Sequence, residues 1–363
     1  QDLLRKMYKG EAMENQNQTP HKRRVRYKGK YPKKFEEKYK ELQPEKYKDT
    51  IEHVIQKGNT PAGMHISIMV KEIIDFLNIQ PGEIGFDATL GYGGHTKAML
   101  KCLNGKGHIY ATDVDPEESD KTKKRLADQG FGEDLLTVKL QNFCTIDEIA
   151  KEVGGFDFIL ADLGVSSMQI DNPKRGFSFK VDGPLDLRLN QEAGISAAER
   201  LDTITRDELA GMLYENSDEP YCEELAKAIT DEIRKGNRID TTTKLRQVIE
   251  KTLDFLPEKE KKDTIKKTCQ RTFQALRIDV NREFEVLYEF MEKLPDALRP
   301  GGRVAILTFH SGEDKLVKKA LKEGYKAGIY SDYAKDVIRP SAQECAQNGR
   351  ARSTKMRWAV KNK

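Results

Sequence analysis

The feature that most restricts how this chain can fold is an alternation of short apolar runs with amphipathic segments between residues 84 and 162. The apolar runs predict strands at 84–89, 108–112, 135–140 and 156–161. The intervening segments, with apolar residues at helical spacing, predict helices near 95–104, 116–129 and 145–152. This order is typical of an α/β fold in which helices cover both faces of a parallel sheet.

The alternation is interrupted after about residue 170. Apolar positions then recur only at helical spacing, over 206–214, 222–234, 243–255 and 258–268. We therefore expect an inserted helical subdomain at 171–270 that recognises the substrate, and a core formed by 61–170 and 271–363. A stripe of apolar residues from Phe273 to Leu294 predicts one long helix, and a further strand follows at 303–309.

Positive charge is concentrated near the beginning of the sequence. The whole chain has a formal net charge of +4, whereas residues 21–48 alone hold 12 Lys/Arg against 4 Asp/Glu. A basic segment of this kind attracts a polyanion, and the interleaved Tyr27, Tyr31 and Tyr39 can stack on bases. We expect residues 1–60 to form a flexible basic extension that contacts nucleic acid. The alternative is a tail that only improves solubility.

Other features of the sequence exclude several classes of protein. No run of about 18 apolar residues occurs, which argues against a membrane span. The five cysteines are scattered and never form a CxxC pair, as expected for free thiols in a reducing cytoplasm. We expect a cytoplasmic protein with neither disulfides nor a metal site.

Three acidic residues, Asp87, Asp113 and Asp162, sit at the ends of predicted strands. In open parallel sheets a ligand binds beyond the carboxyl ends of the strands, so these side chains should converge there. The glycine-rich turn at 91–94 allows close approach of the backbone to a ligand, and Asp113 can accept both hydroxyls of a ribose. The turn lacks the third glycine of the dinucleotide fingerprint. The pattern therefore favours a methyltransferase over an NAD-dependent dehydrogenase, which remains an alternative.

Several longer motifs are more specific. They are DLGVSSMQID at 162–171, RGFSF at 175–179, DGPLDLR at 182–188, HISIMVKE at 65–72, GYGGH at 91–95, RTFQALRI at 271–278, FHS at 309–311 and RARS at 350–353. In this order they closely resemble the MraW/RsmH family, over roughly residues 64–360. The resemblance implies a Rossmann-like class I methyltransferase sheet with an inserted helical domain. It also implies that S-adenosyl-L-methionine is the methyl donor and the N4 amino group of a cytosine in the decoding region of 16S ribosomal RNA is the acceptor.

The resemblance carries over to individual positions. It implies that the cofactor is contacted by Gly93, Gly94, His95, Asp113, Phe143, Asp162 and Gln169. Two positions depart from the family pattern: Gly312 stands where leucine is usual, and Gly349 where proline is usual. Together with the N-terminal extension, these departures indicate a divergent paralogue and leave the target nucleotide open.

An exocyclic amino group is a poor nucleophile, because its lone pair is delocalised into the ring. Methyl transfer therefore needs an acceptor that orients the amino group, and we assign this catalytic role to Asp162; its alternative is a structural cap at the strand end. Attack by a cysteine on the ring is disfavoured, since no cysteine lies in the 162–171 loop.

Six residues are candidates for contacting the RNA substrate. They are Lys174, Arg175, Phe177, Phe179, Arg188 and His310. The basic side chains could bind phosphate and the rings could stack on a base. The alternatives are that Phe177 and Phe179 belong to the core and that His310 is a structural histidine.

The expected partner is the 16S ribosomal RNA of the small subunit. The sequence leaves the oligomeric state open, a homodimer included. It also leaves open a methyltransferase acting on another RNA or on DNA, and an inactive, cofactor-binding factor in ribosome assembly.

Overall fold

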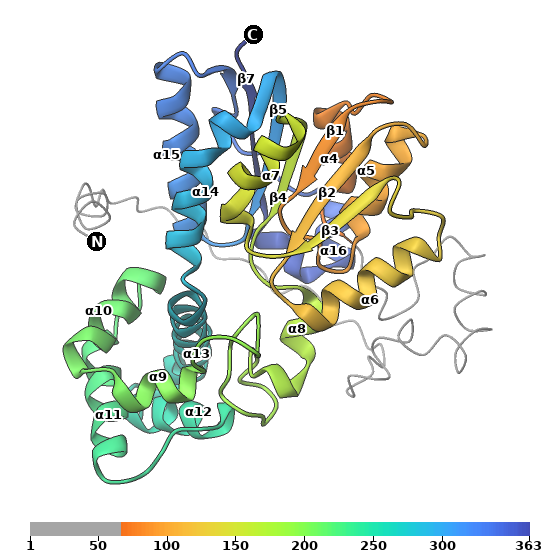
Figure 1. Ribbon diagram of the computed structural model, residues 1–363. Helices are drawn as coiled ribbons and strands as arrows, with labels where there is room; N and C mark the ends of the chain where they lie inside the picture. Colours follow the sequence, from red (N-terminus) through yellow and green to blue (C-terminus); the bar gives the residue numbers. More distant parts are fainter. Residues whose placement is uncertain (1–66) are drawn as a thin grey trace.

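The computed structural model describes residues 67–363 (Figure 1). Its centre is a seven-stranded sheet in the order β3-β2-β1-β4-β5-β7-β6. The strands are β1 (Ile84–Asp87), β2 (His108–Asp113), β3 (Leu136–Leu140), β4 (Phe156–Asp162), β5 (Leu298–Thr308), β6 (Tyr330–Tyr333) and β7 (Lys355–Lys361). All neighbours pair in parallel except β7, which is antiparallel to both β5 and β6. The predicted α/β fold with a Rossmann-like sheet is confirmed.

The strand order reverses beside β1, because the chain runs outward to β2 and β3 and then returns to β4 on the other side of β1. A reversal of this kind opens a crevice at the carboxyl ends of the strands. Asp87 and Asp162 end the two central strands, and Asp113 ends β2. The topology therefore places the three predicted acidic residues along the same edge of the sheet.

Helices cover both faces of the sheet. They are α4 (Val70–Leu77), α5 (Gly94–Leu103), α6 (Pro116–Ala127), α7 (Ile146–Val153), α14 (Glu283–Ala297) and α15 (Ser311–Lys326). Alternate residues of β4 face opposite layers: Phe158 and Leu160 join the core beneath α4 and α5, whereas Ile159 and Ala161 join the core beneath α7 and α14. The continuous apolar runs of the central strands arise because both of their faces are buried.

A second body consists of helices with a core of their own. It contains α9 (Ala197–Thr203), α10 (Arg206–Ser217), α11 (Cys222–Arg234), α12 (Thr242–Thr252) and much of α13 (Glu258–Asn281). We call this part the helical body; in Figure 1 it lies below the sheet. The four segments predicted as helical are helical, and α9 adds a fifth helix that the apolar spacing did not single out.

The single long helix expected across 273–294 is wrong. Arg282, with a left-handed backbone (φ 51°, ψ 42°), ends α13 and precedes α14. Phe273 before the break packs in the helical body, whereas Leu287 after it packs against the sheet. The expected boundary at 270/271 also falls inside α13, which joins the two bodies (Figure 1). The apolar stripe from Phe273 to Leu294 was misleading because both helices are amphipathic. A single residue with a left-handed backbone between them does not change the spacing of the apolar residues.

Two further observations concern membrane spans and cysteines. Within residues 67–363, no helix has both the length and the apolar character needed to cross a bilayer. The five cysteines all lie in this part of the chain and carry free thiols; Cys144 and Cys269 are buried.

Candidate active site

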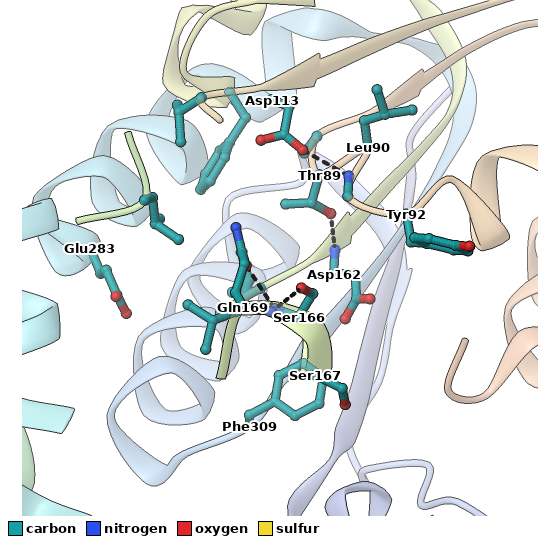
Figure 2. Close-up of a pocket in the computed structure, with 18 of the residues that line it drawn as sticks. Thr89, Leu90, Tyr92, Asp113, Asp162, Ser166, Ser167, Gln169, Glu283 and Phe309 are labelled. Atoms are coloured by element: carbon teal, nitrogen blue, oxygen red, sulfur yellow. Dashed lines mark hydrogen bonds between the residues drawn. The ribbon is translucent and has the colours of Figure 1, made fainter. Parts of the chain in front are cut away.

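A cavity of about 370 Å³ lies at the carboxyl ends of β1, β2 and β4. Its lining includes all seven predicted cofactor-binding residues: Gly93, Gly94, His95, Asp113, Phe143, Asp162 and Gln169. Figure 2 shows Asp113, Asp162 and Gln169 arranged around this space. The common hollow expected from the sequence therefore exists.

The turn between β1 and α5 requires glycine for two separate reasons. Gly91 and Gly93 have positive φ angles of 48° and 78°, a region that other residues rarely adopt. A Cβ atom at Gly94 would lie 2.0 Å from the Oγ of Ser67, and one at Gly93 would lie 2.7 Å from the Cγ2 of Thr122. The backbone of the turn thus forms a wall of the cavity at the N-terminus of α5, where amide groups attract negative charge.

Asp113 is held rigidly at the end of β2. Its Oδ2 accepts the N–H of Gly91 at 2.8 Å, and its Oδ1 accepts the N–H of Asp115 at 2.9 Å. Burial raises the pKa of Asp113 to about 6, although the two N–H groups favour the charged form. Each oxygen keeps a second lone pair, so the carboxylate can accept two neighbouring hydroxyl groups.

Asp162 is anchored through its backbone and one side-chain oxygen. Its N–H donates to the Oγ1 of Thr89 at 2.8 Å, as Figure 2 shows. Its Oδ2 lies 3.3 Å from the Nδ1 of His95. The other oxygen, Oδ1, is buried and has no hydrogen-bond partner among the described residues. A buried carboxylate oxygen without a donor is costly, so this oxygen suits a donor supplied by a ligand.

Gln169 and Phe143 line the cavity from two different short helical elements. Gln169 belongs to the short helix α8 (Ser167–Asp171), where it forms a capping box with Ser166, and its Nε2 donates to Asp115 at 3.1 Å. Phe143 begins the 3-10 turn η2 (Phe143–Thr145) and packs edge-on against Phe290, with ring centroids 5.2 Å apart. Phe143 therefore offers a fixed apolar surface next to the polar cavity floor.

The far wall of the cavity contains residues that the sequence did not single out. Arg277 of α13 donates two hydrogen bonds to Glu283 of α14, at 2.7 and 2.9 Å. Gln274 and Asn281 of α13 line the same wall. Figure 2 shows Glu283 on the side opposite Asp162. The motif at 271–278 was a signal for part of this wall, but no pattern indicated Glu283.

His310 also lines the cavity, and it caps α15 through its Nδ1. Its Nε2 lies 3.2 Å from Glu313, whose carboxylate also accepts the N–H of Phe309 at 2.9 Å. Burial opposes the charge of Glu313, but His310 and these hydrogen bonds outweigh it and hold the pKa of Glu313 below its usual range. Glu283, His310 and Glu313 bring three possible metal ligands within 4.8 Å, yet Glu283 already accepts two hydrogen bonds from Arg277 and Glu313 accepts the N–H of Phe309.

The other five substrate candidates lie outside the cavity lining. Arg175 is buried and forms an ion pair with Asp115 at 2.8 Å, so its guanidinium is not free to bind phosphate. Phe177 is buried in the core of the helical body, and Phe179 packs edge-on against Phe273 at 5.8 Å. Phe177 and Phe179 thus have the packing role that was their alternative interpretation, whereas the ion pair of Arg175 was not predicted.

Arg188 and Lys174 complete the set of candidates. Arg188 forms two hydrogen bonds to Asp186, at 2.8 and 2.9 Å, and so its charge is already paired. Lys174 is exposed to solvent in the turn η3 (Pro173–Arg175). Of the six candidates, the structure brings only His310 into the cavity.

Residues 62–362 match the sequence model of the MraW methylase family. The chain belongs to this family. "Ribosomal RNA small subunit methyltransferase H 1" of Agathobacter rectalis is 88% identical over 341 residues, which are 94% of this chain and 98% of that protein. The protein of the same name from Lachnoclostridium phytofermentans is 69% identical and covers 98% of this chain and 97% of its own length.

A relative of lower identity has the same name without a numeral. "Ribosomal RNA small subunit methyltransferase H" of Acidobacterium capsulatum is 36% identical over 301 residues, covering 82% of this chain and 98% of that protein. Because the match with the Lachnoclostridium protein spans 98% of the chain, it includes most of the segment that precedes residue 62. That segment is thus shared with numbered relatives and lies outside the family model.

The departure from the family pattern at Gly312 has a physical reason. A Cβ atom there would lie 2.6 Å from the Cζ of Phe284 and 3.2 Å from the Nδ1 of His310. Phe284 packs edge-on against His310, with ring centroids 5.7 Å apart. In this member of the family, the Phe284 ring occupies the space that a side chain at 312 would need. Gly349, by contrast, has open space around its Cα.

Proposed function

We propose that this member of the MraW methylase family transfers a methyl group from S-adenosyl-L-methionine to small-subunit ribosomal RNA. The acceptor we propose is the N4 amino group of a cytosine in the decoding region of 16S ribosomal RNA. Relatives named ribosomal RNA small subunit methyltransferase H support the substrate class. The single observation that carries the chemistry is the unpartnered Oδ1 of Asp162 in the cavity that Asp113 and the glycine turn also line.

The residues present fit the proposed cofactor. Asp113 offers two oxygens, each fixed by a backbone N–H, to the ribose hydroxyls. Phe143 would lie beside the adenine, and the backbone at Gly93 and Gly94 can approach the ligand closely because no side chain intervenes. When bound, the cofactor supplies an electrophilic methyl group on a sulfonium.

Asp162 would act on the acceptor. Its free Oδ1 can accept a hydrogen from the exocyclic amino group, which fixes the direction of the nitrogen lone pair. Orientation of this kind can lower a barrier by roughly 7–11 kcal/mol in favourable cases. The carboxylate would therefore both position the amino group and favour the tetrahedral geometry that methylation requires.

The helical body and the far wall would hold the RNA. A target cytosine has to leave its stack to reach a cavity at the sheet edge, so its neighbours need support. We propose that the inserted helical segment provides part of this support, with Arg277, Glu283 and His310 facing the extruded base. Residues 1–60, which lie outside the described part of the chain, would contact phosphates through their positive charge. We propose that the reaction takes place in the cytoplasm. A homodimer remains a prediction, which light scattering of the purified protein can check.

Asp162 provides the direct test of this function. Asp162→Ala should reduce methyl transfer to 16S ribosomal RNA by at least 10³-fold, while S-adenosylhomocysteine still raises the melting temperature. The Asp120→Ala variant removes an exposed carboxylate of α6 outside the cavity; it is the control and should keep its activity. Near-normal turnover of the Asp162 variant would refute the role.

The acceptor is tested separately by nucleoside mass spectrometry of ribosomal RNA from cells that lack the protein. Loss of N4-methylated cytidine from the small subunit supports the proposal. Loss of a different methylated nucleoside would assign another RNA target, and no change would favour an assembly factor without catalysis.

A further inference from the structure

The imidazole of His95 is buried between two hydrogen-bond acceptors. Its Nε2 lies 2.8 Å from the carbonyl oxygen of Ile68, and its Nδ1 lies 3.3 Å from the Oδ2 of Asp162. The side chain of His95 is 8% exposed. A carbonyl oxygen and an ionised carboxylate can only accept, so each ring nitrogen has to carry a hydrogen to satisfy its neighbour. The geometry is that of an imidazolium.

The charged groups around His95 favour the same protonation state. Asp162 faces the ring from β4, and Asp87 contributes a second carboxylate from β1. Asp87 is held by the Oγ1 of Thr96 at 2.6 Å and the N–H of Thr89 at 3.1 Å. Burial lowers the pKa of His95, but the two carboxylates and the Ile68 carbonyl outweigh burial and raise that pKa above its usual value.

We infer that His95 is a positioning residue for methyl transfer, acting as an imidazolium that holds the Oδ2 of Asp162 and thereby leaves Oδ1 to the acceptor amino group. This inference rests on the proposed function of Asp162. It gives the His95 side chain a task distinct from the cofactor contact that its place in the glycine turn implies. The N–H of Asp162 is fixed by Thr89, so His95 supplies the second constraint that orients the carboxylate.

The rate of methyl transfer should depend on the protonation state of His95. A neutral imidazole keeps one hydrogen and can donate to either Ile68 or Asp162, but not to both. As the pH rises through the raised pKa of His95, Asp162 loses its fixed orientation and the rate should fall. Because the pKa of His95 lies above the usual 6.5, the rate of methyl transfer should decline on the high-pH side of the pH–rate profile.

The decisive variant is His95→Gln, which offers Asp162 a neutral donor that does not titrate. We expect kcat to fall roughly ten- to hundredfold, as for loss of a hydrogen bond to a charged group, and the alkaline decline to disappear. The matched control is His108→Gln: His108 also has both nitrogens near acceptors, but it lies at the opposite end of β2 and should leave the rate and profile unchanged.

A measurement without turnover separates this inference from the proposed function. Nitrogen-15 NMR of the imidazole of His95 should show both nitrogens protonated at pH 6, and Asp162→Asn should lower the pKa of His95. A neutral ring at pH 6, or an unaltered pKa in that variant, would overturn the inference even where methylation is normal. If NMR shows a doubly protonated His95 ring but the wild-type protein methylates no RNA, the proposed function is wrong, whereas the ion pair between His95 and Asp162 is still supported.

Discussion

The affinity of this protein for the cofactor should depend on pH through Asp113. The ribose hydroxyls are donors, and the carboxylate accepts both only when it is ionised. Burial raises the pKa of Asp113 to about 6, so protonation begins to compete with binding just below neutral pH. The backbone N–H groups of Gly91 and Asp115 occupy one lone pair on each oxygen and remain in place throughout.

The magnitude follows from the fraction of ionised Asp113. At pH 7.5 about 97% of the carboxyl groups are charged, and at pH 5 about 9% are, for a pKa of about 6. The Kd for S-adenosylhomocysteine should therefore rise roughly tenfold between these pH values. The ligand's own carboxylate and ammonium keep their charges over this interval, so the change reports on the protein.

Isothermal titration calorimetry at several pH values measures this dependence directly. Asp113→Asn removes the titrating group, and its affinity should be low and nearly independent of pH between 5 and 7.5. A wild-type Kd that stays constant over this range would refute the reasoning. So would an Asp113→Asn variant with the full wild-type pH dependence, because another group would then be responsible.

Three further predictions follow from other contacts. Gly312→Ala places a Cβ atom 2.6 Å from Phe284 and should lower the free energy of unfolding by about 1–3 kcal/mol in urea denaturation; an unchanged stability would mean that the ring moves freely. Arg175→Ala leaves Asp115 buried without its ion pair and should cost about 3–5 kcal/mol of stability while sparing the salt dependence of RNA binding. Deletion of residues 1–60 should weaken RNA binding and reduce its salt slope but preserve cofactor affinity, and an identical slope would contradict a role in phosphate contact.

Much of the sheet could be predicted because burial on both faces gives a local signal. The strand from Phe156 and the acid that ends it, Asp162, were recognisable as an apolar run followed by a charge. Parallel topology then requires such strand ends to meet, so the convergence of Asp113 and Asp162 needed no knowledge of side-chain packing.

The rest depended on tertiary contacts that local patterns do not encode. From the sequence, Arg175 was a candidate phosphate contact. In the structure it forms an ion pair with Asp115, which is 60 residues earlier in the chain. The sequence around Phe177 looks the same whether its ring stacks on a base or, as the structure shows, packs in the core of the helical body. Glu283 lines the cavity only because α14 begins directly after the left-handed residue Arg282, which apolar spacing could not reveal.

The continuity of α13 has a mechanical consequence. Phe273 and Leu276 are packed in the core of the helical body, and within the next two turns Arg277 and Asn281 line the cavity. Backbone hydrogen bonds make these turns one stiff rod. Any rotation of the helical body relative to the sheet therefore displaces the wall that faces Asp162. In the proposed complex, RNA on the outer helices and a base in the cavity would then be unable to adjust independently of each other.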